Sequence, residues 1–175
     1  TVVKVTYICI SKFERKTMHE TLYWVIIAIL ILDFLFESYL DYLNSTKMSK
    51  KLPEEVKGIY DEKEYKKQQE YQRENRRFGF ISGTFSFLLI LAMFLFHGFA
   101  YVDKIAWNLT SSPILAAFIF FGILMFASDI LNTPFSVYHT FVIEEKYGFN
   151  KTTPATFVLD KIKGWFLSAL IGGGL

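Results

Sequence analysis

A polar segment separates two apolar runs in the second half of the chain. It reads Pro134-Phe-Ser-Val-Tyr-His-Thr-Phe-Val-Ile-Glu-Glu-Lys-Tyr-Gly-Phe-Asn-Lys-Thr-Thr153. Two adjacent carboxylates, Glu144 and Glu145, are followed by Lys146 and by a predicted turn at 148–150. Hydrophobicity explains the flanking runs, but it does not explain this specific polar sequence. We therefore expect the segment to carry information about the function of the protein.

The composition predicts an all-α protein with several membrane-spanning helices. Of the 175 residues, 52% are hydrophobic and 18% are aromatic, which exceeds the usual content of a soluble domain. The apolar residues also come in blocks instead of being spread along the chain. The net charge is only +2, so the chain has no general attraction for nucleic acid.

Four apolar stretches are candidates for a bundle of membrane helices. They are Leu22–Leu43, Phe78–Val102, Pro113–Thr133 and a last stretch that begins near Ile162. We expect Pro134 to lie just past the end of the third helix. About 20 residues are needed to cross the hydrocarbon core, and the last stretch is shorter. We therefore expect a fragment whose last membrane helix is truncated.

The connecting segments predict the topology. Residues 44–77 contain ten Lys and Arg residues, whereas the loop between the second and third stretches has only Lys104. Because positive loops stay on the cytoplasmic side, residues 44–77 and 134–161 are expected to be cytoplasmic. Acids and bases alternate at helical spacing over Glu54–Arg77, which indicates either a solvated helix or a helix that docks on a partner or acidic lipid.

Carboxylates also occur within the apolar stretches. Asp33, Glu37 and Asp41 are spaced so that they share one helix face, and Asp129 lies near the end of the third stretch. A carboxylate at membrane depth usually faces a bundle interior or water. Two interpretations stay open for Asp33, Glu37 and Asp129: an internal aqueous cavity, or the membrane interface. Asp41 is expected at the interface.

No metal or cofactor site is predicted within the chain. The sequence His19-Glu20-Thr21-Leu22-Tyr23 has Tyr23 where a zinc peptidase helix needs its second His. Cys9 is the only cysteine, so it cannot form an intrachain disulfide. Residues 1–17 are expected to be a non-native or disordered extension, with Met18 as the natural initiator.

The polar segment and its surroundings resemble a known family. The segment is followed by Phe157-x-x-Asp160-x-x-Lys163, and the upstream loop contains Leu52-Pro53-Glu54-Glu55. Together they resemble the N-terminal membrane domain of type I CAAX prenyl proteases, which are integral-membrane zinc metalloendopeptidases. The resemblance covers nearly everything from Leu22 to Leu175, so residues 18–175 would be an incomplete N-terminal membrane domain.

The resemblance implies a fold and an activity for the whole protein. Family members enclose a water-filled chamber and trim the last residues from farnesylated CAAX proteins. Their zinc is held by a His-Glu-x-x-His motif and a later Glu, none of which is in this chain. The fragment alone is thus expected to bind no zinc and to be inactive. Its partners would be its own missing C-terminal catalytic half, the lipid bilayer and prenylated or other membrane-associated substrates.

The resemblance also implies roles for individual side chains. The expected chamber-lining residues are Asp33, Glu37 and Asp129. The expected supports of the loop against the catalytic half are Glu144, Glu145, Phe149, Asn150, Asp160 and Lys163. Glu144 and Glu145 are predicted to pair with Lys161, Lys163 or a downstream Arg. Alternatives for this loop are direct contact with substrate, or a plain surface turn with Phe149 in lipid.

The location and the rival functions follow from the same observations. The protein is expected in a bacterial cell membrane or in the endoplasmic reticulum membrane. One rival to the protease is a non-catalytic membrane scaffold that keeps the fold without the zinc motif. The other is a small ion-coupled transporter that uses the intramembrane acids.

Overall fold

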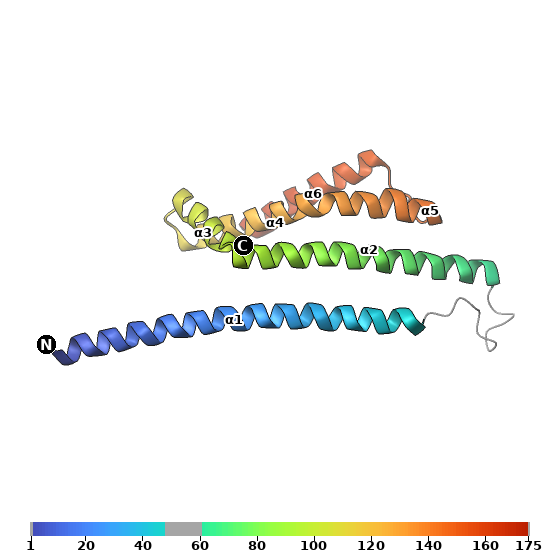
Figure 1. The fold of residues 1–175 in the computed structure, drawn as a ribbon. Coiled ribbons are helices and arrows are strands. Elements are labelled where there is room, and N and C mark those ends of the chain that lie inside the picture. The colour runs from blue at the N-terminus through green and yellow to red at the C-terminus, as the bar shows by residue number, and fades with distance from the viewer. Residues whose placement is uncertain (1, 48–60, 175) are drawn as a thin grey trace. The chain divides into compact units, whose positions relative to one another are not determined.

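The described part of the protein is entirely helical, as predicted. The computed structural model describes residues 2–47 and 61–174, with side chains described within 20–46 and 61–172. The elements are α1 (Val2–Lys47), α2 (Glu62–Leu95), α3 (Gly98–Leu109), α4 (Pro113–Tyr138), the π-helical turn η2 (His139–Glu144), α5 (Glu145–Tyr147) and α6 (Pro154–Gly174) (Figure 1). They fall into two units, 1–47 and 48–175.

The first unit is the single helix α1, Val2–Lys47. Its stretch Glu20–Thr46 is long and apolar enough to cross a membrane and contains the predicted first span. Residues 2–17 belong to the same helix, and their non-native origin stays a prediction.

Helix α2 joins a charged half and an apolar half without a break. Asp61 caps its start, because the Asp61 side chain accepts a hydrogen bond from the Lys63 backbone N–H at 2.8 Å. Glu62 and Glu64 lie in the first turn, where they complement the helix dipole. The helix predicted over the charged loop is thus confirmed from Glu62 onward, and its predicted residues 54–60 lie outside the described part.

The second predicted span, Phe78–Val102, is wrong at its end. Helix α2 ends at Leu95, and His97 adopts a left-handed conformation with φ 57°. Gly98 follows at a close approach: a Cβ there would lie 2.5 Å from the Met93 sulfur. After this join the chain continues as the separate helix α3, which buries Val102 and Ala106.

Helix α4 passes through the proline that was expected to follow it. It begins with Pro113 in its first turn and continues through Pro134 to Tyr138. A proline inside a helix removes one backbone donor. Polar side chains surround this point and bond to backbone carbonyls: Thr133 Oγ1 donates to the Asp129 carbonyl at 2.7 Å and Ser136 Oγ to the Asn132 carbonyl at 3.2 Å. Such bonds help a helix to tolerate proline at membrane depth.

The predicted loop 134–161 is also mostly helical. Helix α4 continues into η2 and α5, which end in a Schellman turn at Gly148 with φ 75°. The Phe149 N–H bonds to the Glu144 carbonyl at 2.9 Å, and the Gly148 N–H to the Glu145 carbonyl at 3.0 Å. The turn predicted at Gly148 is therefore present, but it closes a helix instead of lying within a long loop.

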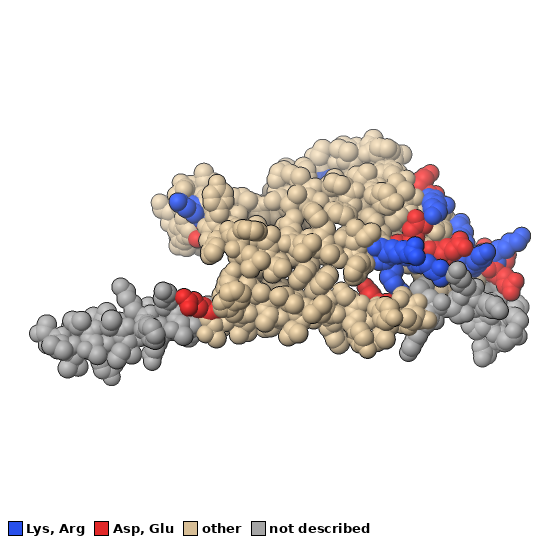
Figure 2. All heavy atoms as spheres, viewed as in Figure 1, with Lys and Arg blue, Asp and Glu red and all other residues tan. Residues whose placement is uncertain are grey.

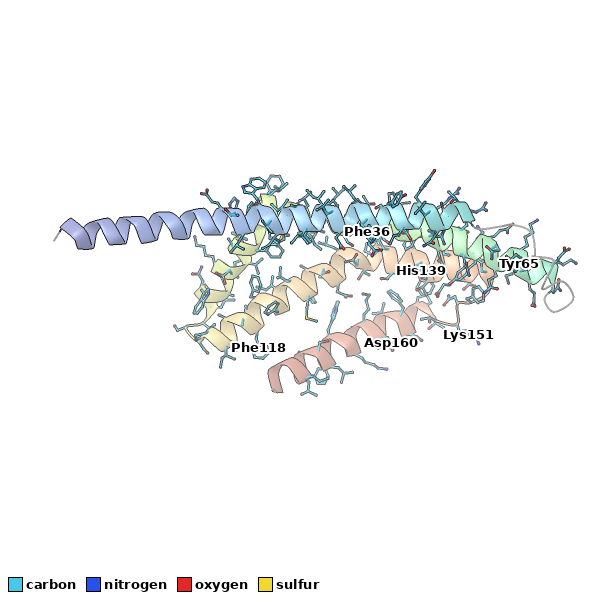
Figure 3. All side chains as sticks on the ribbon, turned by 90° about the horizontal axis from the view of Figure 1, so that it is seen from below. Phe36, Tyr65, Phe118, His139, Lys151 and Asp160 are labelled. Atoms are coloured by element: carbon cyan, nitrogen blue, oxygen red, sulfur yellow. The ribbon has the colours of Figure 1, made fainter. Side chains whose placement is uncertain are left out.

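Helix α6 begins at Pro154, eight residues before the predicted start at Ile162. Thr153 caps it, because its Oγ1 accepts from the Thr156 N–H at 3.2 Å. The helix has 21 residues, more than the predicted apolar stretch, but it is not among the segments that qualify as membrane spans in the described part of the chain. Helices α4 and α6 lie side by side in both views (Figure 1, Figure 3).

Large apolar side chains lie on the outside of the helices. Within the described side chains, the buried apolar residues are few: Ile27, Val102, Ala106, Ala116, Ile143 and Tyr147. By contrast, Ile114 and Phe121 of α4 are 73% and 61% exposed. Among the described residues, three segments qualify as membrane spans: Glu20–Thr46, Glu62–Leu95 and Pro113–Tyr147. Lipid instead of water therefore explains the exposed apolar surface.

Candidate functional site

The polar segment 139–153 is fixed to the charged half of α2 by a carboxylate. The Glu74 side chain accepts hydrogen bonds from Lys146 Nζ at 2.6 Å and from the Tyr147 hydroxyl at 2.8 Å. Tyr147 is only 7% exposed, so its hydroxyl needs this partner, whereas the Lys146 side chain is 57% exposed. We call Glu74, Lys146 and Tyr147 the Glu74 cluster.

Aromatic rings pack beside the Glu74 cluster. Tyr71 of α2 contacts the Tyr147 ring at 5.2 Å and the Phe149 ring at 4.7 Å between centroids. Lys67 Nζ lies 5.8 Å from the centre of the Phe149 ring. Such ring contacts stabilise a packed arrangement beyond simple burial. Phe149 therefore packs on α2, although it stays 51% exposed, and is not free to act only as a lipid anchor.

The π-helical turn η2 brings a histidine against α2. His139 Nε2 lies 3.0 Å from the Asn75 amide oxygen, and His139 Nδ1 lies 3.6 Å from Glu144 Oε1. Phe78 stacks on Tyr138 with centroids 5.5 Å apart. Single π-turns within helices occur frequently at functional sites, because the extra residue redirects the side chains.

The predicted loop residues hold the end of the segment together. Asn150 Nδ2 donates to Glu145 Oε2 at 2.8 Å, and Asn150 Oδ1 accepts from the Thr152 N–H at 2.7 Å. Glu144 supplies the carbonyl that closes the Schellman turn. Four predicted residues, Glu144, Glu145, Phe149 and Asn150, therefore meet in one small structure. Their role as supports of the loop against the catalytic half stays a prediction.

The predicted pairing of the two glutamates with lysines of α6 is wrong within the described residues. Glu145 bonds to Asn150 and Glu144 lies beside His139, whereas Lys161 bonds to Asp129. Asp160 and Lys163 face each other at 3.9 Å, with their side chains 63% and 70% exposed. They form a surface pair on α6.

An open polar pocket lies between α2 and α4, next to His139. Its volume is about 520 Å³. On the α2 side the lining residues are small apart from Phe78, and on the α4 and η2 side they are mainly polar. The lining consists of Phe78, Gly79, Ser82, Gly83, Ser86, Asn132, Phe135, Ser136, His139 and Thr140. Hydroxyl and amide groups at membrane depth suit a watery or polar occupant better than lipid tails.

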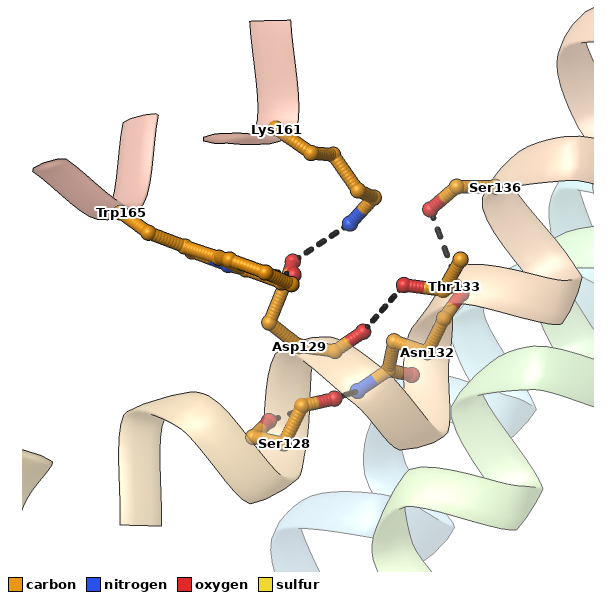
Figure 4. Close-up of polar contacts among 7 residues, drawn as sticks. All are labelled: Ser128, Asp129, Asn132, Thr133, Ser136, Lys161 and Trp165. Atoms are coloured by element: carbon orange, nitrogen blue, oxygen red, sulfur yellow. Dashed lines mark hydrogen bonds and ion pairs between the residues drawn. The ribbon is translucent and has the colours of Figure 1, made fainter. Parts of the chain in front are cut away.

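The predicted chamber-lining acids occupy two different settings. Asp33 and Glu37 are exposed on α1. The Asp129 carboxylate instead receives two donors from α6: Lys161 Nζ at 2.6 Å and Trp165 Nε1 at 2.9 Å (Figure 4). The role of the three acids as chamber-lining residues stays a prediction.

The sequence interpretation missed the α2 side of this site. Tyr71, Glu74 and Asn75 lie in a stretch where charged and polar residues alternate, so no single residue stands out. Glu74 and Lys146 are also 72 positions apart, a distance that a pattern in one sequence cannot bridge. The only available signal was that charged and aromatic residues adjoin in both segments.

No metal centre forms within the described part of the chain. No three His, Cys, Asp or Glu side chains gather there closely enough to hold a metal ion. The described residues therefore do not fit the zinc of a peptidase.

The fold and the docked polar segment define an integral-membrane helical domain. The model of the CAAX prenyl protease N-terminal family, described as five membrane helices, matches residues 41–175. The chain belongs to this family.

Relatives agree with this assignment. The chain is 30% identical to CAAX prenyl protease 1 of Saccharomyces cerevisiae over 92% of its length and 39% of the relative. It is 33% identical to the CAAX prenyl protease 1 homolog of Caenorhabditis elegans over 74% of its length and 29% of the relative. The crystal structure of S. mikatae Ste24p matches with a TM-score of 0.74 and 31% identity, over 84% of this chain and 36% of that one. The chain thus spans well under half the length of these relatives.

Proposed function

We propose that this chain is the membrane part of a zinc metalloendopeptidase that removes C-terminal residues from CAAX-type or other membrane-associated proteins. The observation that carries the proposal is the docked polar segment: the most specific residues of the family resemblance are also those that fix η2 and α5 to α2. The family match and the names of the relatives support the activity.

In this proposal the chain supports catalysis and does not perform it. The zinc ligands and the general base belong to residues outside this chain, and the fragment by itself is inactive. When bound there, zinc supplies the Lewis acid and activates the attacking water. The residues of this chain hold the loop 139–153 rigid through Glu74 and Asn150, and they line one polar side of the substrate space.

The proposed location is the endoplasmic reticulum membrane, which the eukaryotic sources of the relatives favour over a bacterial membrane. The charged side chains of the second unit gather where α2 begins and α5 ends (Figure 2). The Glu74–Lys146 contact joins the two segments predicted to be cytoplasmic, so both lie at the same end. This placement supports a common cytoplasmic side for them.

The decisive experiment uses the complete protein expressed from its gene and reconstituted in liposomes. We expect it to release the terminal tripeptide from a farnesylated peptide that ends in a CAAX sequence, as measured by mass spectrometry. A zinc chelator should stop the release, and added zinc should restore it. A folded complete protein that leaves the peptide intact would favour the scaffold, and ion uptake by the same vesicles would favour the transporter.

The role of the loop has a test of its own. Glu145→Ala removes the acceptor of Asn150, so the complete enzyme should lose about three- to tenfold in turnover because the loop is no longer held. Lys151→Ala, at an exposed neighbouring position, is the matched control. Unchanged turnover and unchanged thermal stability in Glu145→Ala would show that this hydrogen bond of the loop does not contribute to the activity.

A further inference from the structure

Helix α6 lies along α4 in the opposite direction and over nearly its whole length. Near the start of α6, Phe157 contacts Phe141 with ring centroids 5.6 Å apart. In its middle, Trp165 contacts Phe126 at 4.8 Å. Near its end, a Cβ on Gly172 would lie 4.0 Å from the Phe118 ring. Because Pro113–Tyr147 qualifies as a membrane span, a helix that lies along it in this way would cross the bilayer together with it.

The composition of α6 opposes that crossing. Among the described residues it is not one of the three segments that qualify as spans by apolar character. Its first half contains Asp160, Lys161 and Lys163. Charged side chains at membrane depth are costly unless they pair or reach water. A partner is therefore required for the charge that the packing of α6 shields most, which is Lys161.

Asp129 of α4 is that partner. It lies close to the middle of the Pro113–Tyr147 span, and its Oδ1 accepts from Lys161 Nζ at 2.6 Å. The second oxygen, Oδ2, accepts from Trp165 Nε1 at 2.9 Å, so both carboxylate oxygens bond to α6 (Figure 4). The Lys161 side chain is only 20% exposed, whereas Lys163 and Asp160 on the same helix are mostly exposed.

We propose that the Asp129 carboxylate is the intramembrane counter-ion that allows α6 to cross the bilayer, by neutralising Lys161 and orienting Trp165. Helix α6 is then a conditional membrane helix, which is stable across the membrane only when α4 is already in place. This inference does not depend on the protease activity, because it concerns insertion alone. It also explains why a helix with three charges packs along α4.

The test measures on which side of the membrane each end of α6 lies. The full chain carries Cys9→Ser and one reporter cysteine, either Lys151→Cys or a cysteine appended after Leu175. In sealed membrane vesicles, a membrane-impermeant thiol reagent should label the two reporters from opposite sides. Asp129→Leu should lower the fraction of chains with opposite labelling by roughly threefold, because Lys161 is left unpaired.

A second pair of variants separates charge pairing from packing. Lys161→Leu removes the buried charge, so adding Asp129→Leu to it should restore insertion to the level of the parent. Ser128→Ala, one residue away on α4, is the control and should leave labelling unchanged. The proposal is overturned if Asp129→Leu inserts as well as the parent chain, or if Lys161→Leu fails to rescue it.

Discussion

The same three-part contact occurs twice in this molecule, in two environments. In the Glu74 cluster a carboxylate receives Lys146 at 2.6 Å and the Tyr147 hydroxyl at 2.8 Å. Between α4 and α6 the Asp129 carboxylate receives Lys161 at 2.6 Å and the Trp165 N–H at 2.9 Å. The local geometry is nearly identical, and the carboxylates are similarly exposed, 29% for Glu74 and 36% for Asp129. The difference lies in the lysines, because the Lys146 side chain is 57% exposed and that of Lys161 is 20% exposed.

The difference teaches that environment, and not distance, sets what an ion pair contributes. Near water both partners of a pair can be solvated separately, so the net gain from pairing is small. At membrane depth an unpaired charge has no comparable alternative, so the loss of one partner is expensive. We therefore expect the Asp129 contact to hold α6 through its charges, and the Glu74 cluster to depend more on its turn and its rings.

The largest expected effect is at the membrane-depth pair. Asp129→Asn should lower the free energy of unfolding in detergent micelles by about 2 kcal/mol, because Lys161 loses its counter-ion. A double-mutant cycle with Lys161→Met measures the coupling directly. Additive effects of the two substitutions would mean that Asp129 and Lys161 are each solvated independently.

A smaller loss is expected from the turn that closes the docked segment. Gly148 has φ 75°, a left-handed conformation that a side chain disfavours, so Gly148→Ala should cost about 1 kcal/mol. Thermal unfolding in the same micelles measures it, with the exposed Lys151→Ala as the control. Equal stability of the two variants would contradict a backbone-controlled docking of this segment.

Removing the buried hydroxyl of the Glu74 cluster should destabilise the protein as much as Gly148→Ala or slightly less. Tyr147→Phe keeps the ring against Tyr71 but removes one donor to Glu74, which should cost about 1 kcal/mol or less. Tyr101→Phe is the matched control, since Tyr101 is 69% exposed. A loss in Tyr147→Phe no greater than in Tyr101→Phe would show that the hydroxyl does not hold the segment.

The smallest loss of stability is expected at Lys146, and its dependence on salt should distinguish this contact from the Asp129 contact. Lys146→Met removes an exposed cation, so its small destabilisation should fade at about 1 M salt, where the Debye length is roughly 3 Å. The effect of Lys161→Met should persist better at that salt concentration, because Lys161 is less exposed than Lys146 and its contact is screened less. The loss of stability is measured by denaturant unfolding. If it depended on salt equally in the two variants, the two contacts would not differ in the way proposed.

Local patterns in the sequence account for much of the fold. Blocks of apolar residues predicted the three segments that qualify as membrane spans among the described residues, and Gly148-Phe149-Asn150 predicted a turn. The errors of the sequence-based prediction concern the ends of helices and the connections between them. Pro134 was expected after α4 but lies inside it, in a stretch where Thr133 and Ser136 bond to the Asp129 and Asn132 carbonyls. Helix α2 ends early at a His97–Gly98 join, which apolar character alone does not reveal.

The sequence by itself determined an all-α membrane domain and its family, because helix formation, apolar length and a specific motif are local properties of the chain. Only the tertiary structure decided that Lys161 bonds to Asp129 and Lys146 to Glu74. Each of these pairs joins helices far apart in the chain, and every carboxylate had several lysines at suitable sequence positions. The choice among them depends on how the helices pack, which no single stretch of sequence specifies.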